Sequence, residues 1–468
     1  MDFNDIFCKD NSNRKDAKAK CMVYNFRVVR FLSSLSGLRF KSAYAIAAIF
    51  IFLAIVWSLC DGSANAPVII RVDPAKKFQK IVGWEATAQA GQSFSAIFPL
   101  YSQELFREAV NDLGINRLRV EIKTAAGDDG NVADPGIPSA FDFTGLDRTI
   151  ESVVFPMRSL LQKRKEKILI NLCYVDFRIG QINFRNNPDQ YAEFVLTIYQ
   201  HLTTKYQLTP YSWEIILEAD NASWSPDQLS AAVVAIGNRL RSGGFQPRLI
   251  VPSTASLAHA STFFDAIIRN PDALKFISEL SYHRYRDVSQ NGLQLIAARV
   301  QKFKIRSAML EHIGSGYTDL HADLKFGQCS AWQQFTLAFP TTNDNGGHYF
   351  GIDARNPNAP TIVMGFRTKF LRQYFNFIRN GARRIEATSN NRSFDPLAFI
   401  NKKRRFVVVV KADSSGPFSV QNLPPGLYGI NYTTSDRYNV SLADVRLAAG
   451  DPLHTSIPAR GVITIYRK

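Results

Sequence analysis

Short hydrophobic runs alternate with longer stretches of helical periodicity through the middle of the chain. The runs have the length and composition of buried strands. They are Ile81–Ala86, Arg117–Ile122, Ile168–Tyr174, Trp213–Glu218, Arg248–Pro252, Phe276–His283, Ser307–Glu311 and Ala331–Phe339. Helical patterns cover Gln103–Leu113, Gln190–Tyr206, Pro226–Arg241, Asn291–Phe303 and Val363–Asn380. Strands that alternate with helices are typical of α/β proteins. Eight such units predict a (β/α)8 TIM barrel, here over residues 81–381, since that fold needs about 250 residues.

The pattern changes after Gly381, where short strand-like runs continue without helices. These runs are Arg405–Lys411, Phe418–Val420, Tyr428–Thr433, Tyr438–Leu442 and Gly461–Tyr466. Turn residues separate them, which predicts an attached C-terminal β-sandwich over residues 382–468. A strand within residues 68–80 precedes the barrel and is expected to join this sandwich. The segment Thr341–Pro360 is rich in Asn, Gly, Asp and Pro and is expected to be a loop over the barrel mouth.

The most hydrophobic stretch lies near the N-terminus. Residues 42–60 contain no charged side chain and are long enough to cross a bilayer as a helix. Basic residues precede this segment, so a cytoplasmic leader at residues 1–41 and an external position for everything after the linker at 61–67 are expected. Cleavage near Ala66, which would release a secreted protein, is the alternative.

The charge of the chain narrows the range of partners. Its 56 Lys and Arg against 40 Asp and Glu give a net charge of +16. Part of that excess lies in the basic leader, and no zinc-finger spacing, phosphate loop or basic-aromatic motif accompanies the rest, so no nucleic acid is expected as a partner. The five cysteines are widely spaced and odd in number, which does not indicate a disulfide framework.

Two glutamates end hydrophobic runs of the predicted barrel. Glu218 ends the run W-E-I-I-L-E, and Glu311 ends S-A-M-L-E. A carboxylate in such a position costs desolvation unless a partner or a function compensates for it. The two residues are 93 positions apart, which corresponds to three units of about 31 residues and assigns them to strands four and seven. Since reactive groups in these barrels stand at the C-terminal ends of strands, we expect both at one mouth.

Two carboxylates that face each other across a barrel mouth suit hydrolysis of a glycosidic bond, because one protonates the leaving oxygen while the other attacks the anomeric carbon. A structural ion pair at the barrel rim is the alternative. No metal is expected, because His312 points to the opposite face from Glu311 and no third ligand is evident. No cofactor is needed for this chemistry.

Three segments resemble motifs of a known family. They are F-Q-K-I-V-G-W-E-A at Phe78–Ala86, L-R-V at Leu118–Val120 and N-G-A-R-R-I-E-A-T-S at Asn380–Ser389. They resemble the first strand, the second-strand arginine segment and the entry into the sandwich of clan A retaining glycosidases, and within them of glycoside hydrolase family 30. The resemblance spans about residues 68–468. It implies that Glu218 is the acid/base and Glu311 the nucleophile.

The residue before Glu218 departs from the clan pattern. Clan members usually have Asn there, which contacts the sugar 2-hydroxyl, whereas this chain has Leu217. The following Asp220 and Asn221 are similar to the E-P-D-N form of related enzymes, with Ala219 in place of Pro. Asn221 is therefore the candidate to replace the missing amide.

Three residues are expected to support the carboxylates. Arg119 is placed to hold Glu311 ionised, with a plain salt bridge to Glu121 as the alternative. His283 and Tyr285 share one face of strand six. The resemblance implies a hydrogen bond from Tyr285 to Glu311. His283 is either a substrate contact or a hydrogen-bonded buried histidine.

Trp332 and Trp84 offer flat faces on which a sugar ring could stack, with burial in the core as the alternative for each. The sequence as a whole predicts an extracytoplasmic retaining β-glycoside hydrolase that acts on a cell-surface or extracellular glycan by double displacement. The alternative is a membrane-anchored carbohydrate-binding protein on the same fold that lacks catalysis. Neither the sugar nor the oligomeric state follows from the sequence.

Overall fold

Eight parallel strands close into a barrel in the computed structural model, which describes residues 67–92, 96–124, 141–176 and 184–468. The ring closes because the last barrel strand pairs with both the first and the seventh barrel strand. The barrel strands are β2 (Gly83–Thr87), β3 (Arg117–Ile122), β4 (Leu169–Tyr174), β5 (Ser212–Glu214), β6 (Leu249–Ser256), β7 (Ile277–Arg286), β8 (Arg306–Glu311) and β9 (Cys329–Phe339). The predicted (β/α)8 barrel is confirmed.

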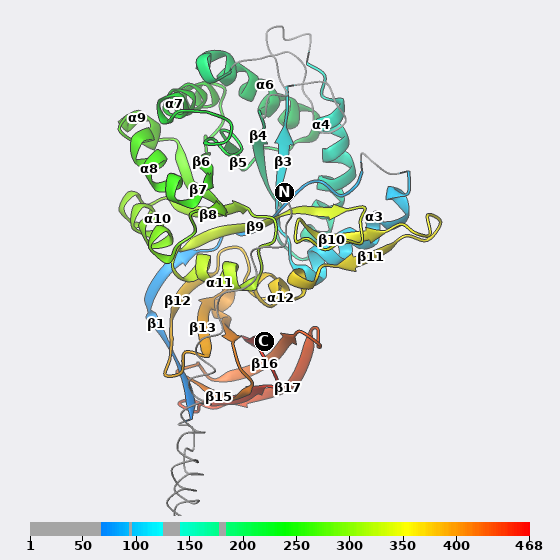
Figure 1. Ribbon diagram of the computed structural model, residues 1–468, viewed down its shortest axis with the longest axis vertical. Coiled ribbons are helices and arrows are strands. Elements are labelled where there is room, and N and C mark those ends of the chain that lie inside the picture. The colour runs from blue at the N-terminus through cyan, green and yellow to red at the C-terminus, as the bar shows by residue number, and fades with distance from the viewer. Residues whose placement is uncertain (1–66, 93–95, 125–140, 177–183) are drawn as a thin grey trace, which may run out of the picture. The chain divides into compact units, whose positions relative to one another are not determined.

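Helices surround this ring on the outside (Figure 1). They are α3 (Phe98–Arg107), α4 (Thr144–Thr149), α5 (Phe155–Lys163), α6 (Pro188–Tyr206), α7 (Pro226–Ser242), α8 (Leu257–Ile267), α9 (Pro271–Leu274), α10 (Gln290–Phe303), α11 (Tyr317–Lys325) and α12 (Phe366–Phe375). Local chemistry fixes several of their starts. Ser225 and Gln228 form a reciprocal capping box at α7, and Ser289 caps α10. The apolar faces of the helices and the outer faces of the strands form one continuous core.

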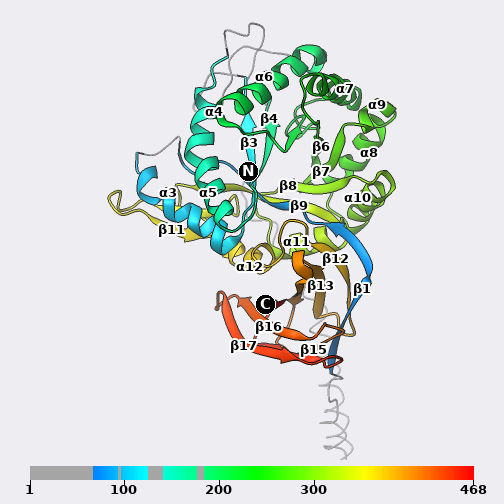
Figure 2. The same ribbon diagram turned by 180° about the vertical axis from the view of Figure 1, so that it is seen from behind.

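The second domain is a nine-stranded mixed sheet, in the order β17-β16-β19-β14-β13-β12-β1-β15-β18. Its strands are β1 (Val68–Lys80), β12 (Arg383–Ser389), β13 (Phe394–Ile400), β14 (Phe406–Ala412), β15 (Gly416–Gln421), β16 (Gly426–Thr434), β17 (Val440–Leu447), β18 (Leu453–Ile457) and β19 (Gly461–Arg467). Residues from both ends of the sheet order share one hydrophobic core, as in a sandwich. Figure 2 shows β1 running from the barrel into this sheet.

The segment Thr341–Pro360 is not the plain loop that its composition predicts. It contains β10 (His348–Asp353), which pairs in parallel with the end of β9, and it leads into β11 (Thr361–Met364), which pairs with β10. The helix predicted from Val363 accordingly begins only at Phe366. Because the segment is rich in turn residues, its composition did not indicate β10, whose Tyr349 and Phe350 are fully buried against the barrel.

The expected membrane segment at residues 42–60 and its basic leader lie outside the described residues. Within the part of the chain that the structure describes, every helix is too short or too polar to cross a bilayer.

An aspartate of the sandwich is bound by two side chains of the barrel helix α11. Lys325 donates to Asp395 Oδ1 at 2.5 Å, and His321 Nε2 lies 3.4 Å from Asp395 Oδ2. Burial alone would raise the pKa of Asp395, but the contacts with His321 and Lys325 outweigh it and hold that pKa well below its usual range. These contacts connect the two domains through one ionised carboxylate.

We expect Asp395→Asn to lower the free energy of unfolding by about 1–2 kcal/mol at pH 7, because a charge-assisted contact is lost. A depressed pKa stabilises the fold above the unfolded-state value of about 3.9 and loses that effect as the pH falls. The difference in stability between the two proteins should therefore be smaller at about pH 3 than at pH 7, as measured by urea unfolding. Asp444→Asn, which removes an exposed pair with Lys468, is the control and should change little. A difference that stays the same at both pH values would contradict this account.

Candidate active site

Glu218 and Glu311 lie together at the C-terminal end of the barrel. Glu311 is the last residue of β8, and Glu218 follows β5 by four positions. Both residues are buried, with relative exposures of 8% for Glu218 and 6% for Glu311. A carboxylate oxygen of Glu218 and one of Glu311 lie within 4.8 Å of each other. A ring nitrogen of His283 on β7 lies within 4.8 Å of both oxygens. The fold therefore brings into contact range two carboxylates that are far apart in the sequence.

Glu311 is held from two sides. The guanidinium of Arg119 on β3 forms an ion pair with Glu311 Oε2, and the hydroxyl of Tyr285 on β7 donates to Oε1 at 2.9 Å. Burial and the negative charge of Glu311 both raise the pKa of Tyr285, so its phenol remains a donor at every physiological pH. Together these contacts stabilise the ionised carboxylate, which is the form that can act as a nucleophile.

Glu218 also has two partners. His283 Nδ1 lies 3.1 Å from Oε1, and the amide of Asn221 donates to Oε2 at 2.6 Å. Burial alone would raise the pKa of Glu218, but these hydrogen bonds prevail and lower it. His283 is fully buried, and its Nε2 has no hydrogen-bond partner among the described residues.

A tight turn presents Glu218. Its backbone is left-handed, with φ at 51°, a conformation that costs free energy for a residue with a side chain. Asp220 secures the turn, because its carboxylate accepts the backbone N–H groups of Ala255 at 2.8 Å and Ser256 at 3.1 Å. Burial opposes the ionisation of Asp220, but these hydrogen bonds outweigh it and lower its pKa. The predicted strand ended at Glu218, whereas β5 ends at Glu214 because the chain turns here.

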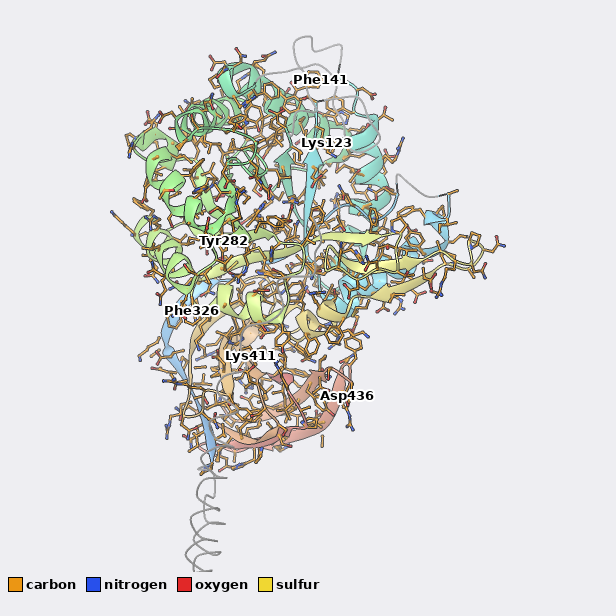
Figure 3. The ribbon with its side chains drawn as sticks, in the orientation of Figure 1. Lys123, Phe141, Tyr282, Phe326, Lys411 and Asp436 are labelled. Carbon is orange, nitrogen blue, oxygen red and sulfur yellow. The ribbon has the colours of Figure 1, made fainter. Side chains whose placement is uncertain are left out.

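Arg119 also pairs with a second carboxylate, that of Glu121. Its Nη2 lies 3.4 Å from Glu121 Oε1, so the two readings of Arg119 from the sequence, support of Glu311 and a salt bridge to Glu121, both occur. Burial raises the pKa of Glu121, against the opposing effects of Arg119 and of Lys123, whose Nζ lies 3.9 Å away. Lys123 is labelled beyond the end of β3 in Figure 3.

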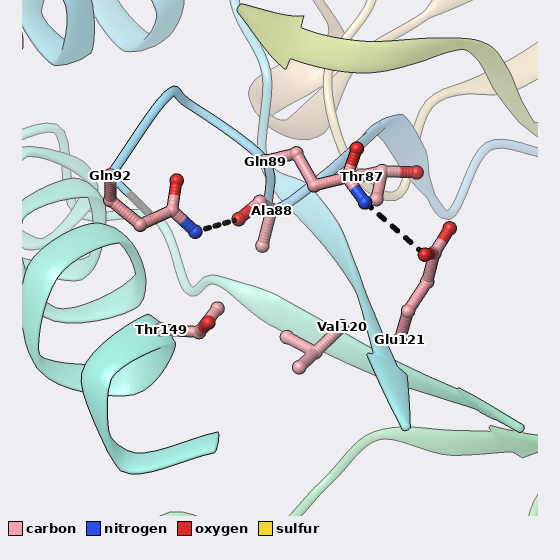
Figure 4. Close-up of a pocket in the computed structure, with 7 residues that line it drawn as sticks. All are labelled: Thr87, Ala88, Gln89, Gln92, Val120, Glu121 and Thr149. Carbon is pink, nitrogen blue, oxygen red and sulfur yellow. Dashed lines mark hydrogen bonds between the residues drawn. The ribbon is translucent and has the colours of Figure 1, made fainter. Parts of the chain in front are cut away.

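A small polar recess lies beside Arg119 (Figure 4). The amide of Gln89 donates to Glu121 Oε2 at 3.2 Å within it. The residues that line it are Thr87, Ala88, Gln89, Gln92, Val120, Glu121 and Thr149. Its volume of about 20 Å³ is enough for a single water molecule. The sequence analysis considered Glu121 only as a salt-bridge partner of Arg119 and assigned no role to Gln89.

A buried ionic layer forms the floor beneath the site. Arg117 donates to both carboxylate oxygens of Glu279, at 3.0 and 2.9 Å, and forms a second ion pair with Glu85. Asn171 donates to Glu85 at 3.2 Å and to Glu214 at 3.1 Å. Burial raises the pKa of Glu85 to about 7 despite the nearby Arg117. The barrel interior is therefore filled by polar groups that depend on one arginine.

Of the two interpretations of Trp84 and Trp332, the sugar-stacking platform is wrong and burial in the core is confirmed. Trp84 stacks on Phe375 at 4.5 Å between ring centroids, and its indole N–H donates to the carbonyl of Ile378. The Trp332 indole N–H donates to Asp323. Both side chains are fully buried, so neither presents a face to a ligand. Each lies on an outward-facing strand position, where an apolar ring packs against the surrounding helices.

The structure shows the surroundings of Leu217, which stands where clan members usually have Asn. Leu217 is buried and packs with Cys173 and Val175 at the end of β4. The replacement amide proposed for Asn221 is already engaged, since its nitrogen bonds Glu218 and its oxygen accepts from Arg286 at 2.9 Å. Position 217 thus contributes to a small apolar cluster and offers no hydrogen-bonding side chain.

The site could also be considered for a metal. Among the described residues, Glu218, His283 and Glu311 are the group whose ligand atoms converge. Their three ligand atoms lie within 4.8 Å of one another, so His283, and not His312, is the third ligand group beside the two glutamates. The positive charge beside Glu311 is already supplied by Arg119.

No protein-family model and no curated protein matches this sequence. Solved structures, however, share its fold. The catalytic domain of a family 30 xylanase C from Talaromyces cellulolyticus has TM-score 0.68 and 15% identity, covering 86% of this chain and 100% of that one. A family 30 subfamily 8 xylanase from Clostridium acetobutylicum has TM-score 0.63 and 17% identity, covering 85% and 98%. An endo-β1,6-glucanase has TM-score 0.64 and 14% identity, covering 85% and 93%. The resemblance to family 30 is confirmed for the fold.

The ionic floor makes a specific prediction for stability. Arg117→Met leaves Glu85 and Glu279 buried without their cation, so we expect a loss of about 3–5 kcal/mol in the free energy of unfolding. The loss should be smaller at pH 5 than at pH 8, because the stranded carboxyl groups become neutral by protonation. Urea unfolding at both pH values measures it. Arg164→Met, at a partly exposed arginine, is the control; an equal loss at both pH values would contradict the ionic explanation.

Proposed function

We propose that this chain is a retaining β-glycoside hydrolase. The observation that carries the proposal is the approach of the Glu218 and Glu311 carboxylates to within 4.8 Å at the C-terminal end of a (β/α)8 barrel. Retaining enzymes hold their carboxyl groups about 5–5.5 Å apart, whereas inverting enzymes need about 6.5–9.5 Å to admit a water molecule. The structural neighbours, which include xylanases and an endo-β1,6-glucanase, support the same class of reaction.

In the first step Glu311 attacks the anomeric carbon and Glu218 protonates the departing oxygen. A covalent glycosyl-enzyme forms. In the second step Glu218, now a carboxylate, takes a proton from water, and the resulting hydroxide displaces Glu311 from the sugar. Arg119 and Tyr285 hold the Glu311 carboxylate in place for the attack, and they contact it again when the second step releases it from the sugar.

Glu218 must alternate between its acid and its base form. In the free protein, hydrogen bonds from His283 and Asn221 favour the carboxylate and lower its pKa. The acid form needed for the first step is therefore more populated at acidic pH. We therefore expect the hydrolytic activity to decline as the pH rises.

The substrate is proposed to be a glycan outside the cytoplasm. This part of the proposal rests on the uncharged segment at residues 42–60 and on the basic residues before it. A retained segment would tether the enzyme to the membrane, and cleavage near Ala66 would release it.

A second candidate is a carbohydrate-binding protein without catalysis. The observation that favours it is Leu217, which places an apolar cluster with Cys173 and Val175 beside Glu218. A substrate hydroxyl facing this cluster would find no partner there. Contacts to the 2-hydroxyl contribute several kcal/mol to the transition state in such enzymes.

The first test is hydrolysis of aryl β-glycosides and β-linked polysaccharides by the unmodified chain, Glu311→Gln and Glu218→Gln. We expect Glu311→Gln to fall to background on every substrate. Glu218→Gln should lose about 10²- to 10⁴-fold on polysaccharides. It should lose less on aryl glycosides whose leaving groups depart without a proton.

Glu104→Gln is the matched control, because Glu104 is an exposed glutamate on α3, and it should retain full activity. Thermal unfolding checks that the variants are folded. Binding of polysaccharide without turnover by the unmodified protein would refute the hydrolase and favour the second candidate.

A further prediction concerns the pH profile. Asn221→Ala removes a donor to the ionised form of Glu218, so the pKa of Glu218 should rise. The acid form then persists to higher pH, and the basic limb of the kcat/KM profile should move upward. Asn238→Ala, at an exposed position on α7, should leave the profile in place. A downward shift or no shift for Asn221→Ala would contradict the role given to this hydrogen bond.

A further inference from the structure

A second concave site, the basic cleft, lies at the end of the barrel opposite to Glu218 and Glu311. It is lined by Lys77, Phe78, Gln79, Lys80, Val300, Gln301, Lys304, Ile305, Arg306, Gln328, Ser330 and Arg383. Residues 304–306 and 328–330 lie at the starts of β8 and β9, whereas Glu311 ends β8. The cleft has a volume of about 490 Å³, which is in the range of ligand sites.

Five cations converge on this cleft. Lys77 and Lys80 come from β1, Arg383 from the neighbouring β12, and Lys304 and Arg306 from the turn into β8. The lining contains no Asp or Glu. Within the described part of the chain, none of the five forms an ion pair, whereas cations elsewhere on the surface, such as Lys76 and Lys275, do so.

A sixth cation lies close by. Lys402 Cε and Lys80 Cε both approach the Cα of Gly381, where a β-carbon would lie 3.5 and 3.7 Å from them. Gly381 has φ at +91°, a conformation that glycine adopts without strain. The passage from the last barrel helix into the sandwich thereby brings a lysine of the β13–β14 turn next to the cleft.

Like charges held together at a surface repel one another, and a concave wall of low dielectric strengthens their field. Mobile counterions offset this repulsion in part. A bound polyanion offsets it better, because it places several negative charges at fixed spacing and releases those counterions. The cations of the basic cleft therefore attract a polymer that carries negative charges at regular intervals.

We propose that the basic cleft binds an acidic polysaccharide, one whose sugars carry carboxylate or sulfate groups. Beside the cations, the cleft offers the polar side chains of Gln301, Gln328 and Ser330, which suit sugar hydroxyls. One face of Phe78 is covered by the guanidinium of Arg384 at 3.8 Å, and Phe78 is the single aromatic residue of the lining. The cleft therefore lacks the series of aromatic rings on which successive nucleic-acid bases stack. The exposed large hydrophobic side chains of the described chain do not line the cleft, which disfavours insertion into a membrane.

Such binding would hold the enzyme on its polymer without taking part in the chemistry. The cleft lies at the opposite end of the barrel from the catalytic pair, so the bound segment and the cleaved bond belong to different stretches of glycan, or to different glycans. Binding at the cleft can be measured whether or not the chain hydrolyses anything.

The experiment is a titration of the full-length protein with polygalacturonate, and with dextran as a neutral polymer, at low ionic strength. Glu311→Gln serves as the background, so that hydrolysis cannot shorten the polymer. Lys80→Gln combined with Lys304→Gln removes two cleft cations. Lys163→Gln combined with Lys302→Gln removes the same charge from exposed lysines that do not line the cleft.

We expect polygalacturonate to bind, dextran not to bind, and affinity to fall with added salt. The cleft pair should bind about tenfold more weakly, while the control pair should stay within about twofold. Equal losses in both pairs would overturn the proposal in favour of attraction by net charge. Absence of binding would also overturn it. So would a cleft-dependent preference for phosphatidylglycerol over phosphatidylcholine vesicles without polygalacturonate binding, which would assign the cleft to a membrane surface.

Discussion

Buried carboxylates need positive charge close to them, and in this barrel one strand supplies most of it. β3 directs Arg117 and Arg119 into the interior, where each is fully buried. Arg117 neutralises Glu85 and Glu279 in the floor, and Arg119 neutralises Glu311 above it. Without these two cations the interior acids would be buried with no compensating charge, which is strongly destabilising.

The two proposed catalytic carboxylates are held in different ways. Glu311 is paired with Arg119, a cation whose charge does not change during the reaction. Glu218 has neutral or titratable partners, Asn221 and His283, which permit it to gain and lose a proton. This asymmetry is what double displacement requires, because the nucleophile stays ionised until it bonds to carbon while the acid/base alternates.

The two ends of the barrel differ in charge as well. The C-terminal end gathers the carboxylates of Glu218, Glu311 and Glu121, of which Glu311 and Glu121 pair with the fully buried Arg119. The N-terminal end beside β1 carries the basic cleft, whose cations have no acidic partner in its lining. Two different tasks, bond cleavage and retention of an anionic polymer, are compatible with this separation because they use residues at opposite ends of the barrel strands.

The sequence by itself determined the periodic elements of the fold and the two glutamates at strand ends, because strand and helix periodicities are local properties and a carboxylate that ends an apolar run is visible in one short window. Only the tertiary structure decided what surrounds them. Trp84 and Trp332 proved to be core residues, since the side of a strand that faces the helices depends on barrel closure. The strand β10 and the turn at Glu218 escaped prediction because partners distant in sequence stabilise them, namely the end of β9 and the backbone N–H groups of Ala255 and Ser256. The basic cleft likewise combines residues from β1, β12 and the start of β8, which no local pattern places together.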